Sequence, residues 1–116
     1  MNLGFMIQTG PYTFENIDTA YNLIKAAIKK GHSCSLFLYM DGSYNINKNI
    51  KPSGDRNIGE MMEELTSLGV EVVGCGVCMQ YRGIKKSMIV SGATRGGLPR
   101  FGEMVKNSDR YISIGF

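Results

Sequence analysis

The amino-acid sequence predicts an α/β protein, a three-layer α/β/α sandwich around a mainly parallel sheet of about five strands. Short, nearly continuous apolar runs alternate along the chain with segments whose apolar residues recur every three or four positions. The connections between the apolar runs are too long for hairpins, so right-handed crossovers between parallel strands are expected. No internal repeat, linker or low-complexity tract interrupts the 116 residues, which predicts a single domain over residues 1–116.

The first predicted elements are a strand, a helix and a second strand. Residues 3–8 (LGFMIQ) form a short apolar run closed by a Thr-Gly-Pro turn, as expected of a buried strand. Residues 14–30 carry the stripe of an amphipathic helix, which Gly31 should end as a left-handed cap. Residues 33–40 (SCSLFLYM) then form a second apolar run, typical of a strand that is covered on both faces.

The stretch 41–55 is predicted to be a loop, because it is rich in Asn, Gly, Ser and Lys and lacks a period. Its length suggests a functional role. A second helix should begin at Arg56 or Asn57 and end at Gly69, since apolar residues recur at helical spacing between these points. Residues 70–74 (VEVVG) are predicted to be the third strand.

The last third of the chain has a weaker pattern. Residues 76–81 are predicted to form a short helix, and residues 88–90 are an apolar run whose type the pattern does not decide. Residues 92–99 are expected to be a flexible glycine-rich loop. A last helix over residues 98–106 and a closing strand over residues 110–114 (RYISI) complete the prediction.

The composition argues against several classes of function. The net charge is only +3 and the basic residues are scattered, which disfavours direct binding of nucleic acid. Three cysteines are too few for a secreted disulfide framework, so a reducing compartment is expected. The start of the chain does not have the pattern of a signal peptide, and no segment approaches the length of a membrane span. We therefore expect a cytoplasmic protein that does not associate with membranes.

The segment VEVVGCGVCMQYRG carries the clearest chemical signal. It places Cys75 just after a predicted strand and Cys78 in the first turn of the next helix, at the sheet edge where such folds bind ligands. Unpaired N–H groups and a partial positive charge at a helix start favour a thiolate, so Cys75 is a candidate nucleophile that should be exposed there. Arg82, one turn after Cys78, is placed to bind an anionic sulfur donor.

That segment lies in one of four blocks through which the sequence resembles the DsrE/DsrF-like family of sulfur-relay proteins. The blocks are GFMIQTGPYTFENIDTAYNLIKAAIKKGH, SLFLYMDGSYNIN, GVEVVGCGVCMQYRGI and NSDRYISIGF, which together span nearly the whole chain. The cysteine block and the YMDGSYNIN loop are the specific parts. In the family, the sulfur-carrying cysteine lies eight residues before the glycine of an Arg-Gly pair. Gly83 matches that glycine, so the resemblance implies that Cys75 is the carrier.

The resemblance implies persulfide transfer without a metal or an organic cofactor. A sulfur-donor protein would load Cys75, and the thiol of a sulfur-acceptor protein would remove the terminal sulfur. The resemblance also implies a ring-shaped trimer or hexamer, built from this chain alone or mixed with paralogous subunits, with the cysteine turn and the Tyr44 loop near the subunit contacts. Tyr44, Gly76 and Arg82 are the candidate substrate-binding or anion-binding residues.

Several alternatives remain open at this point. Cys78 is either a core residue or a resolving thiol that attacks the Cys75 persulfide, releases sulfide and leaves a disulfide. The Cys75-Gly-Val-Cys78 spacing also allows a thioredoxin-like dithiol oxidoreductase, although the Trp that is common before such motifs is lacking. A third alternative is a non-catalytic subunit of a sulfur-transfer complex.

The remaining candidates have weaker signals. Cys34 lies in the middle of a predicted strand and is expected in the core. His32, the only histidine, follows a helix cap and suggests a structural hydrogen bond, and too few ligands are available for a closed zinc site. Met79 stands where a dinucleotide-binding fingerprint would have its third glycine. Arg95 and Arg100 flank a glycine-rich loop before a helix, where an anion could bind.

Overall fold

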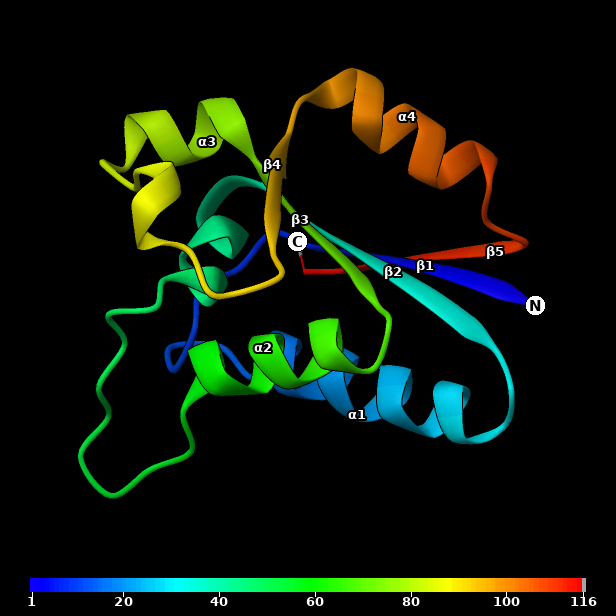
Figure 1. Ribbon diagram of the computed structural model, residues 1–116, viewed down its shortest axis with the longest axis horizontal. Coiled ribbons are helices and arrows are strands. Elements are labelled where there is room, and N and C mark those ends of the chain that lie inside the picture. The colour runs from blue at the N-terminus through cyan, green and yellow to red at the C-terminus, as the bar shows by residue number, and fades with distance from the viewer. Residues whose placement is uncertain (116) are drawn as a thin grey trace.

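The computed structural model of the protein describes residues 1–115 and has a central five-stranded sheet with helices on both faces (Figure 1). The strands are β1 (Asn2–Ile7), β2 (Ser33–Leu38), β3 (Glu71–Cys75), β4 (Thr94–Gly96) and β5 (Arg110–Ile114). They pair in the order β4-β3-β2-β1-β5, and every pairing is parallel. This confirms the predicted fold class. Phe116, the last residue of the NSDRYISIGF block, lies outside the described residues.

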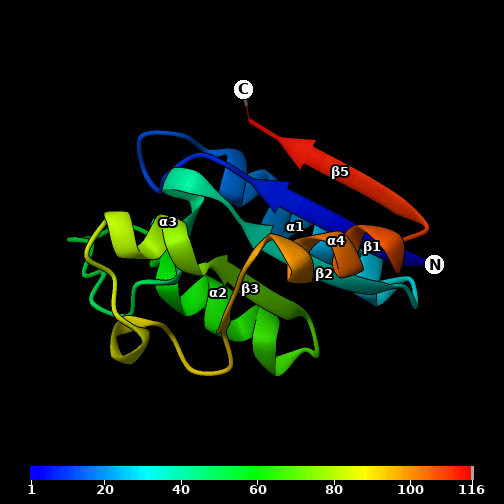
Figure 2. The ribbon, with the colours of Figure 1, turned by 90° about the horizontal axis from the view of Figure 1, so that it is seen from above.

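The helices form the two outer layers of the sandwich. Helices α1 (Asn16–Lys29) and α2 (Ile58–Ser67) lie side by side on one face, and α3 (Gly76–Tyr81) and α4 (Leu98–Lys106) lie on the other (Figures 1 and 2). Two short 3₁₀ helices, η1 (Met40–Ile46) and η2 (Lys86–Met88), lie in the connections. No helix within residues 1–115 is long and apolar enough to cross a lipid bilayer.

The sheet separates a large core cluster from a small one. In β2, Leu36 and Leu38 belong to the large cluster, whereas Phe37 between them belongs to the small one, as the alternation of side chains along a strand requires. Both faces of the strand are therefore buried, which explains its unbroken apolar run. The small cluster contains Phe37, Val73, Cys75, Cys78 and Met104. The two candidate cysteines thus belong to the core cluster on the face of the sheet that α3 and α4 cover.

Helix boundaries follow the predicted chemistry closely. Gly31 and Gly69 end α1 and α2 with φ angles of +90° and +89°, values that glycine adopts without the steric cost a side chain imposes. Asn57 caps the start of α2, and its side-chain oxygen accepts a hydrogen bond of 3.0 Å from the Glu60 N–H. The carboxyl ends of β1, β2 and β3 lie at a common edge because these strands pair in parallel.

Two of the predicted loops contain regular structure. The expected loop 92–99 includes β4, which pairs with β3 although its sequence, Thr-Arg-Gly, has no apolar residue to signal a strand. The expected loop 41–55 begins in η1, where Ser43, Asn45 and Ile46 are fully buried. Residues 88–90 contribute no strand to the sheet, and Met88 ends η2 instead.

Candidate functional site

Cys75 is the last residue of β3 and the cap of α3, so it lies at the carboxyl end of the sheet as predicted. The expectation of an exposed sulfur was wrong, because Cys75 is only 3% exposed. Phe37, Val73 and Met104 belong to the same core cluster, and α3 and α4 cover it from above. Its access to open space is a cavity of about 370 Å³, which we call the thiol cavity. The residues that line it are Tyr39, Met40, Cys75, Val77, Cys78, Tyr81, Arg82, Gly97 and Leu98.

Cys78 lines the same cavity and lies one helical turn after Cys75. Both thiols are free, and Cys78 is 8% exposed. The backbone N–H of Met40 donates to the Cys78 sulfur at an N to Sγ distance of 3.2 Å. Met40 begins η1 with a φ of +52°, which is unusual for a residue with a side chain. This conformation at the end of β2 gives Cys78 a backbone donor.

The environment of Cys78 favours the protonated thiol. Burial raises the pKa of Cys78 most, and the hydrogen bond with the Cys75 side chain raises it further. The Met40 N–H and the positive charge of Arg82 act in the opposite direction without overcoming these causes. Cys78 therefore keeps its proton at neutral pH, and its S–H group is positioned as a donor to the Cys75 sulfur.

Arg82 is fixed beside the thiols by three contacts. Its Nε donates to Asp41 Oδ1 at 2.7 Å, its Nη1 donates to the carbonyl oxygen of Cys78 at 3.0 Å, and its guanidinium lies 6.0 Å from the centre of the Tyr44 ring. The Arg82 side chain is 22% exposed, whereas that of Asp41 is 60% exposed. Asp41 thus contacts Arg82 at the site, although the sequence pattern did not predict a role for it.

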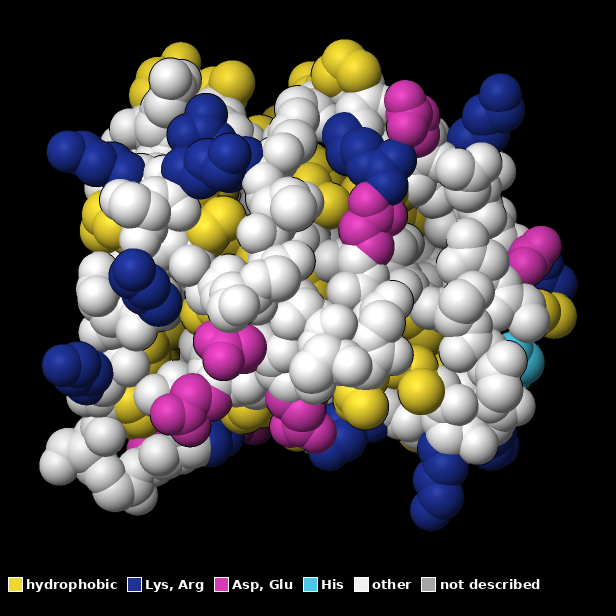
Figure 3. All heavy atoms as spheres, in the orientation of Figure 1, with side chains coloured by type: hydrophobic (Ala, Val, Ile, Leu, Met, Phe, Trp, Pro, Cys, Tyr) yellow, Lys and Arg dark blue, Asp and Glu magenta, His cyan; other side chains and the backbone are white. Residues whose placement is uncertain are grey.

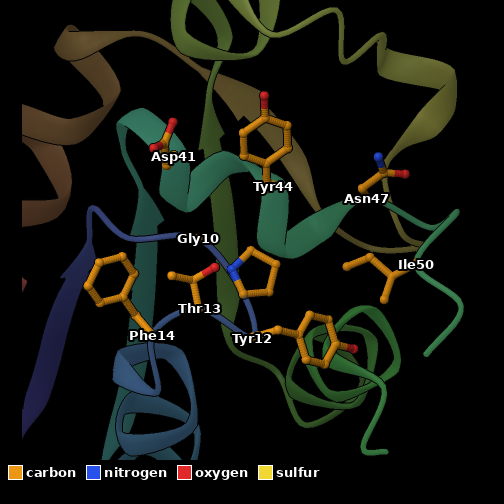
Figure 4. A pocket seen from close by; sticks show the side chains of 9 residues that line it. Gly10, Tyr12, Thr13, Phe14, Asp41, Tyr44, Asn47 and Ile50 are labelled. Atoms are coloured by element: carbon orange, nitrogen blue, oxygen red, sulfur yellow. The ribbon is translucent and has the colours of Figure 1, made fainter. Parts of the chain in front are cut away.

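Tyr44 does not line the thiol cavity. Together with Asp41 it faces a second cavity, of about 470 Å³, between η1 and the loop that follows β1 (Figure 4). Tyr12 projects into this cavity and has a φ of +72°. Its hydroxyl donates to the Arg56 carbonyl at 2.9 Å and accepts from the Ile58 N–H at 3.1 Å. The Asp41–Arg82 ion pair therefore lies between the two cavities, with Arg82 on one and Asp41 on the other.

Gly76 and the two predicted loop arginines lie elsewhere. Gly76 lines a third cavity, together with Arg95, rather than the thiol cavity. Arg100 forms ion pairs with Glu71 and Glu103, so its charge is compensated within the protein. Only Arg95 of the two flanking arginines is therefore placed to bind an anion.

His32 and Cys34 lie outside the three cavities. His32 Nδ1 lies 3.0 Å from the terminal amine of Met1, which agrees with the predicted structural hydrogen bond. Cys34 is buried in β2, and burial raises the pKa of its thiol. Residues 1–115 contain no cluster of three His, Cys, Asp or Glu side chains that could hold a metal ion.

Comparison with known proteins agrees with the fold and with the resemblance to the DsrE/DsrF-like family. A profile of the DsrE/DsrF-like family matches residues 1–114. The chain belongs to this family. It is 36% identical over 87 residues to the putative sulfurtransferase DsrE of Allochromatium vinosum, covering 72% of this chain and 67% of that protein. It is 30% identical over 132 aligned positions to the sulfurtransferase TusD of Buchnera aphidicola, covering 98% of this chain and all of that protein.

A solved structure similar to this chain is that of the YchN protein of E. coli. Its crystal structure superposes on this chain with a TM-score of 0.87 at 25% sequence identity, covering 98% of this chain and 100% of YchN. The agreement over the whole length means that the parallel sheet and its carboxyl edge, where the thiol cavity lies, are features of the shared fold.

Proposed function

We propose that the protein carries sulfur as a persulfide on Cys75 and passes it between protein partners. The observation that carries this proposal is the position of Cys75, at the carboxyl end of a parallel strand in a cavity that also holds a second thiol and an arginine. Membership of the DsrE/DsrF-like family supports it, because relatives of the chain are named sulfurtransferases.

The chemistry is a pair of thiol–persulfide exchanges. In the first, the Cys75 thiolate attacks the terminal sulfur of a donor persulfide, R–S–SH. The new bond joins Cys75 Sγ to that sulfur. The S–S bond of the donor breaks, and the donor leaves as the thiolate R–S⁻. In the second, an acceptor thiolate attacks the outer sulfur and Cys75 leaves as a thiolate. Neither exchange involves a net oxidation or reduction, so the scheme needs no redox cofactor.

Three neighbours of Cys75 have distinct roles in this scheme. The Cys78 S–H group donates to the Cys75 sulfur and stabilises its anionic form in both exchanges. The Met40 N–H donates to the Cys78 sulfur and helps to fix its position. Arg82, held in place by Asp41 and the Cys78 carbonyl, lines the cavity and offers the rest of its guanidinium to an anionic sulfur donor.

The rim of the cavity suits a protein partner. Val77, Tyr81 and Leu98 line it and are 54%, 84% and 59% exposed, although each is a large apolar side chain. Apolar patches of this kind are typical of protein interaction sites. We propose that sulfur-donor and sulfur-acceptor proteins contact this rim in the cytoplasm, and that the chain itself assembles into a trimer or hexamer, alone or with paralogues.

The proposal is tested by loading the protein with a persulfide donor and measuring its intact mass. Wild type and the Cys78→Ser and Cys34→Ser variants should each gain the mass of sulfur atoms, whereas Cys75→Ser should not. Circular dichroism of each variant controls for folding. If Cys75→Ser gains sulfur at the rate of the wild type, Cys75 is not the carrier.

One observation favours a second candidate function, dithiol–disulfide exchange. Cys75 and Cys78 line the same cavity, and both are free thiols. Oxidation with a small disulfide reagent discriminates the two functions. An oxidoreductase would form a reversible Cys75–Cys78 disulfide and would reduce insulin, and both reactions would require Cys78. A persulfide carrier would retain its sulfur loading without Cys78.

A further inference from the structure

A third cavity lies beside the edge strand β4 and has an uncompensated positive charge. Its volume is about 570 Å³. Lys86 from η2 and Arg95 from β4 line it together with three glycines, and none of its lining residues is acidic. We call it the basic cavity. Cys75 and Cys78 are not among its lining residues, and it shares only Gly97 with the thiol cavity.

The two cations of this cavity are free of ion pairs within residues 1–115. Arg100, five residues after Arg95, differs from them because it forms ion pairs with both Glu71 and Glu103. In Figure 3, basic side chains gather over α3 and η2 without acidic ones among them, whereas acidic side chains lie over α2. An anion that enters the basic cavity thus meets no carboxylate among the residues that line it.

Arg95 lies close to the backbone at the start of α3. A Cβ atom at Gly76 would lie 3.8 Å from Arg95 Nε and 3.9 Å from Nη2, so the guanidinium rests against the glycine. Gly96 and Gly97 form another part of the wall, and at the exposed Gly97 the lack of a side chain leaves the backbone accessible. A guanidinium fork, an ammonium group and accessible backbone are the groups that bind tetrahedral oxyanions in proteins.

From these observations we infer that the basic cavity is a binding site for a phosphate-type dianion, held between Lys86 and Arg95. Its volume falls in the range of small-molecule sites and exceeds what an inorganic ion needs, which favours the phosphate group of a small ester over free phosphate. Thr94 also lines the cavity and offers a hydroxyl to the organic part. This site is independent of the sulfur chemistry proposed for Cys75.

The test is a titration of the uniformly ¹⁵N-labelled protein, followed by NMR, with inorganic phosphate in one arm and ribose 5-phosphate in the other. Chloride keeps the ionic strength constant in both. The amide signals of Gly76, Arg95, Gly96 and Gly97 should shift in both arms, and the ester should bind more tightly. Lys86→Ala and Arg95→Ala should each weaken binding about tenfold, the effect of losing one charge-assisted hydrogen bond.

Lys85→Ala is the matched control, since Lys85 is the exposed neighbour of Lys86 and does not line the cavity. It should bind both ligands like the wild type. The inference is overturned if neither ligand shifts these signals, or if Lys85→Ala weakens binding as much as Arg95→Ala, because the effect would then be one of general surface charge. Tighter binding of inorganic phosphate than of the ester would contradict the ester as the ligand.

Discussion

The backbone N–H of Met40 donates to the sulfur of Cys78 at 3.2 Å and thereby links the loop after β2 to the helix after β3. Met40 has a φ of +52°, so the chain adopts an unfavourable conformation where this donor is needed. The contact explains why the two most specific blocks of the sequence, the YMDGSYNIN loop and the cysteine block, belong to one site.

The first prediction concerns the acidity of Cys78. Burial and the hydrogen bond with Cys75 both raise its pKa, so half-maximal labelling of Cys78 by iodoacetamide should require a pH above the ordinary thiol value of about 8.5. Labelling at each residue is read by peptide mass spectrometry. In Cys75→Ala the second cause is lost, and the midpoint should fall. A midpoint at or below the ordinary value in the wild type would contradict the assigned donor role.

The same pKa shift predicts how stability depends on alkaline pH. The folded protein holds the Cys78 proton more tightly than the unfolded chain, so the stabilisation is complete below the unfolded pKa of about 8.5 and is lost as the pH rises through the folded pKa. Urea unfolding should therefore give a free energy of unfolding that declines above about pH 8.5. Cys78→Ala should decline less steeply over that range, and an equal slope would count against the shift.

Arg82 is predicted to promote sulfur loading through its charge. Arg82→Ala removes the cation beside the thiols and releases Asp41, so loading from an anionic persulfide should slow about tenfold, as expected for one lost charge-assisted hydrogen bond. Arg82→Lys should recover part of the rate because it keeps the charge without the guanidinium fork. Stopped-flow loading measures these rates. Loading of Arg82→Ala at the wild-type rate would remove Arg82 from the mechanism.

Gly42 is predicted to be essential to the loop that supplies Met40. A Cβ atom at this position would overlap the carbonyl oxygen of Ile7, which is backbone and cannot move aside. Gly42→Ala should therefore destabilise the protein by about 2 kcal/mol or more. Gly102→Ala is the matched control, because nothing lies within 4 Å of its Cβ position inside α4, and it should stabilise by about 0.5–1 kcal/mol. Thermal unfolding distinguishes these opposite signs.

The sequence predicts the fold well wherever burial leaves a periodic pattern. The stripes of α1 and α2 and the apolar runs of β1, β2 and β3 locate these elements to within two residues of their bounds. β4 has no such pattern, since Thr94, Arg95 and Gly96 are held by backbone pairing to β3 alone. η1 escapes prediction for a related reason. Its buried Ser43 and Asn45 are polar, and their Oγ and Nδ2 donate to the carbonyls of Met40 and Gly42, each at 2.8 Å.

The candidate site divides in the same way. Cys75, Cys78 and Arg82 lie within eight residues of one another, so their proximity is visible in the sequence. Met40 and Asp41 come from the end of β2, and Leu98 comes from α4, so only the parallel sheet brings them to the cysteines. The burial of Cys75 also depends on tertiary packing, because α4, which helps to cover it, lies more than twenty residues further along the chain.

The location of the added sulfur tests the central claim most directly. After the wild-type protein is loaded with a persulfide donor, alkylation traps any persulfide, and fragmentation of the peptide that contains both Cys75 and Cys78 assigns the extra sulfur to one residue. Our account predicts that the trapped persulfide lies on Cys75, while Cys78 carries either no label or the alkyl group alone. A persulfide found on Cys78, with Cys75 unmodified, would contradict it.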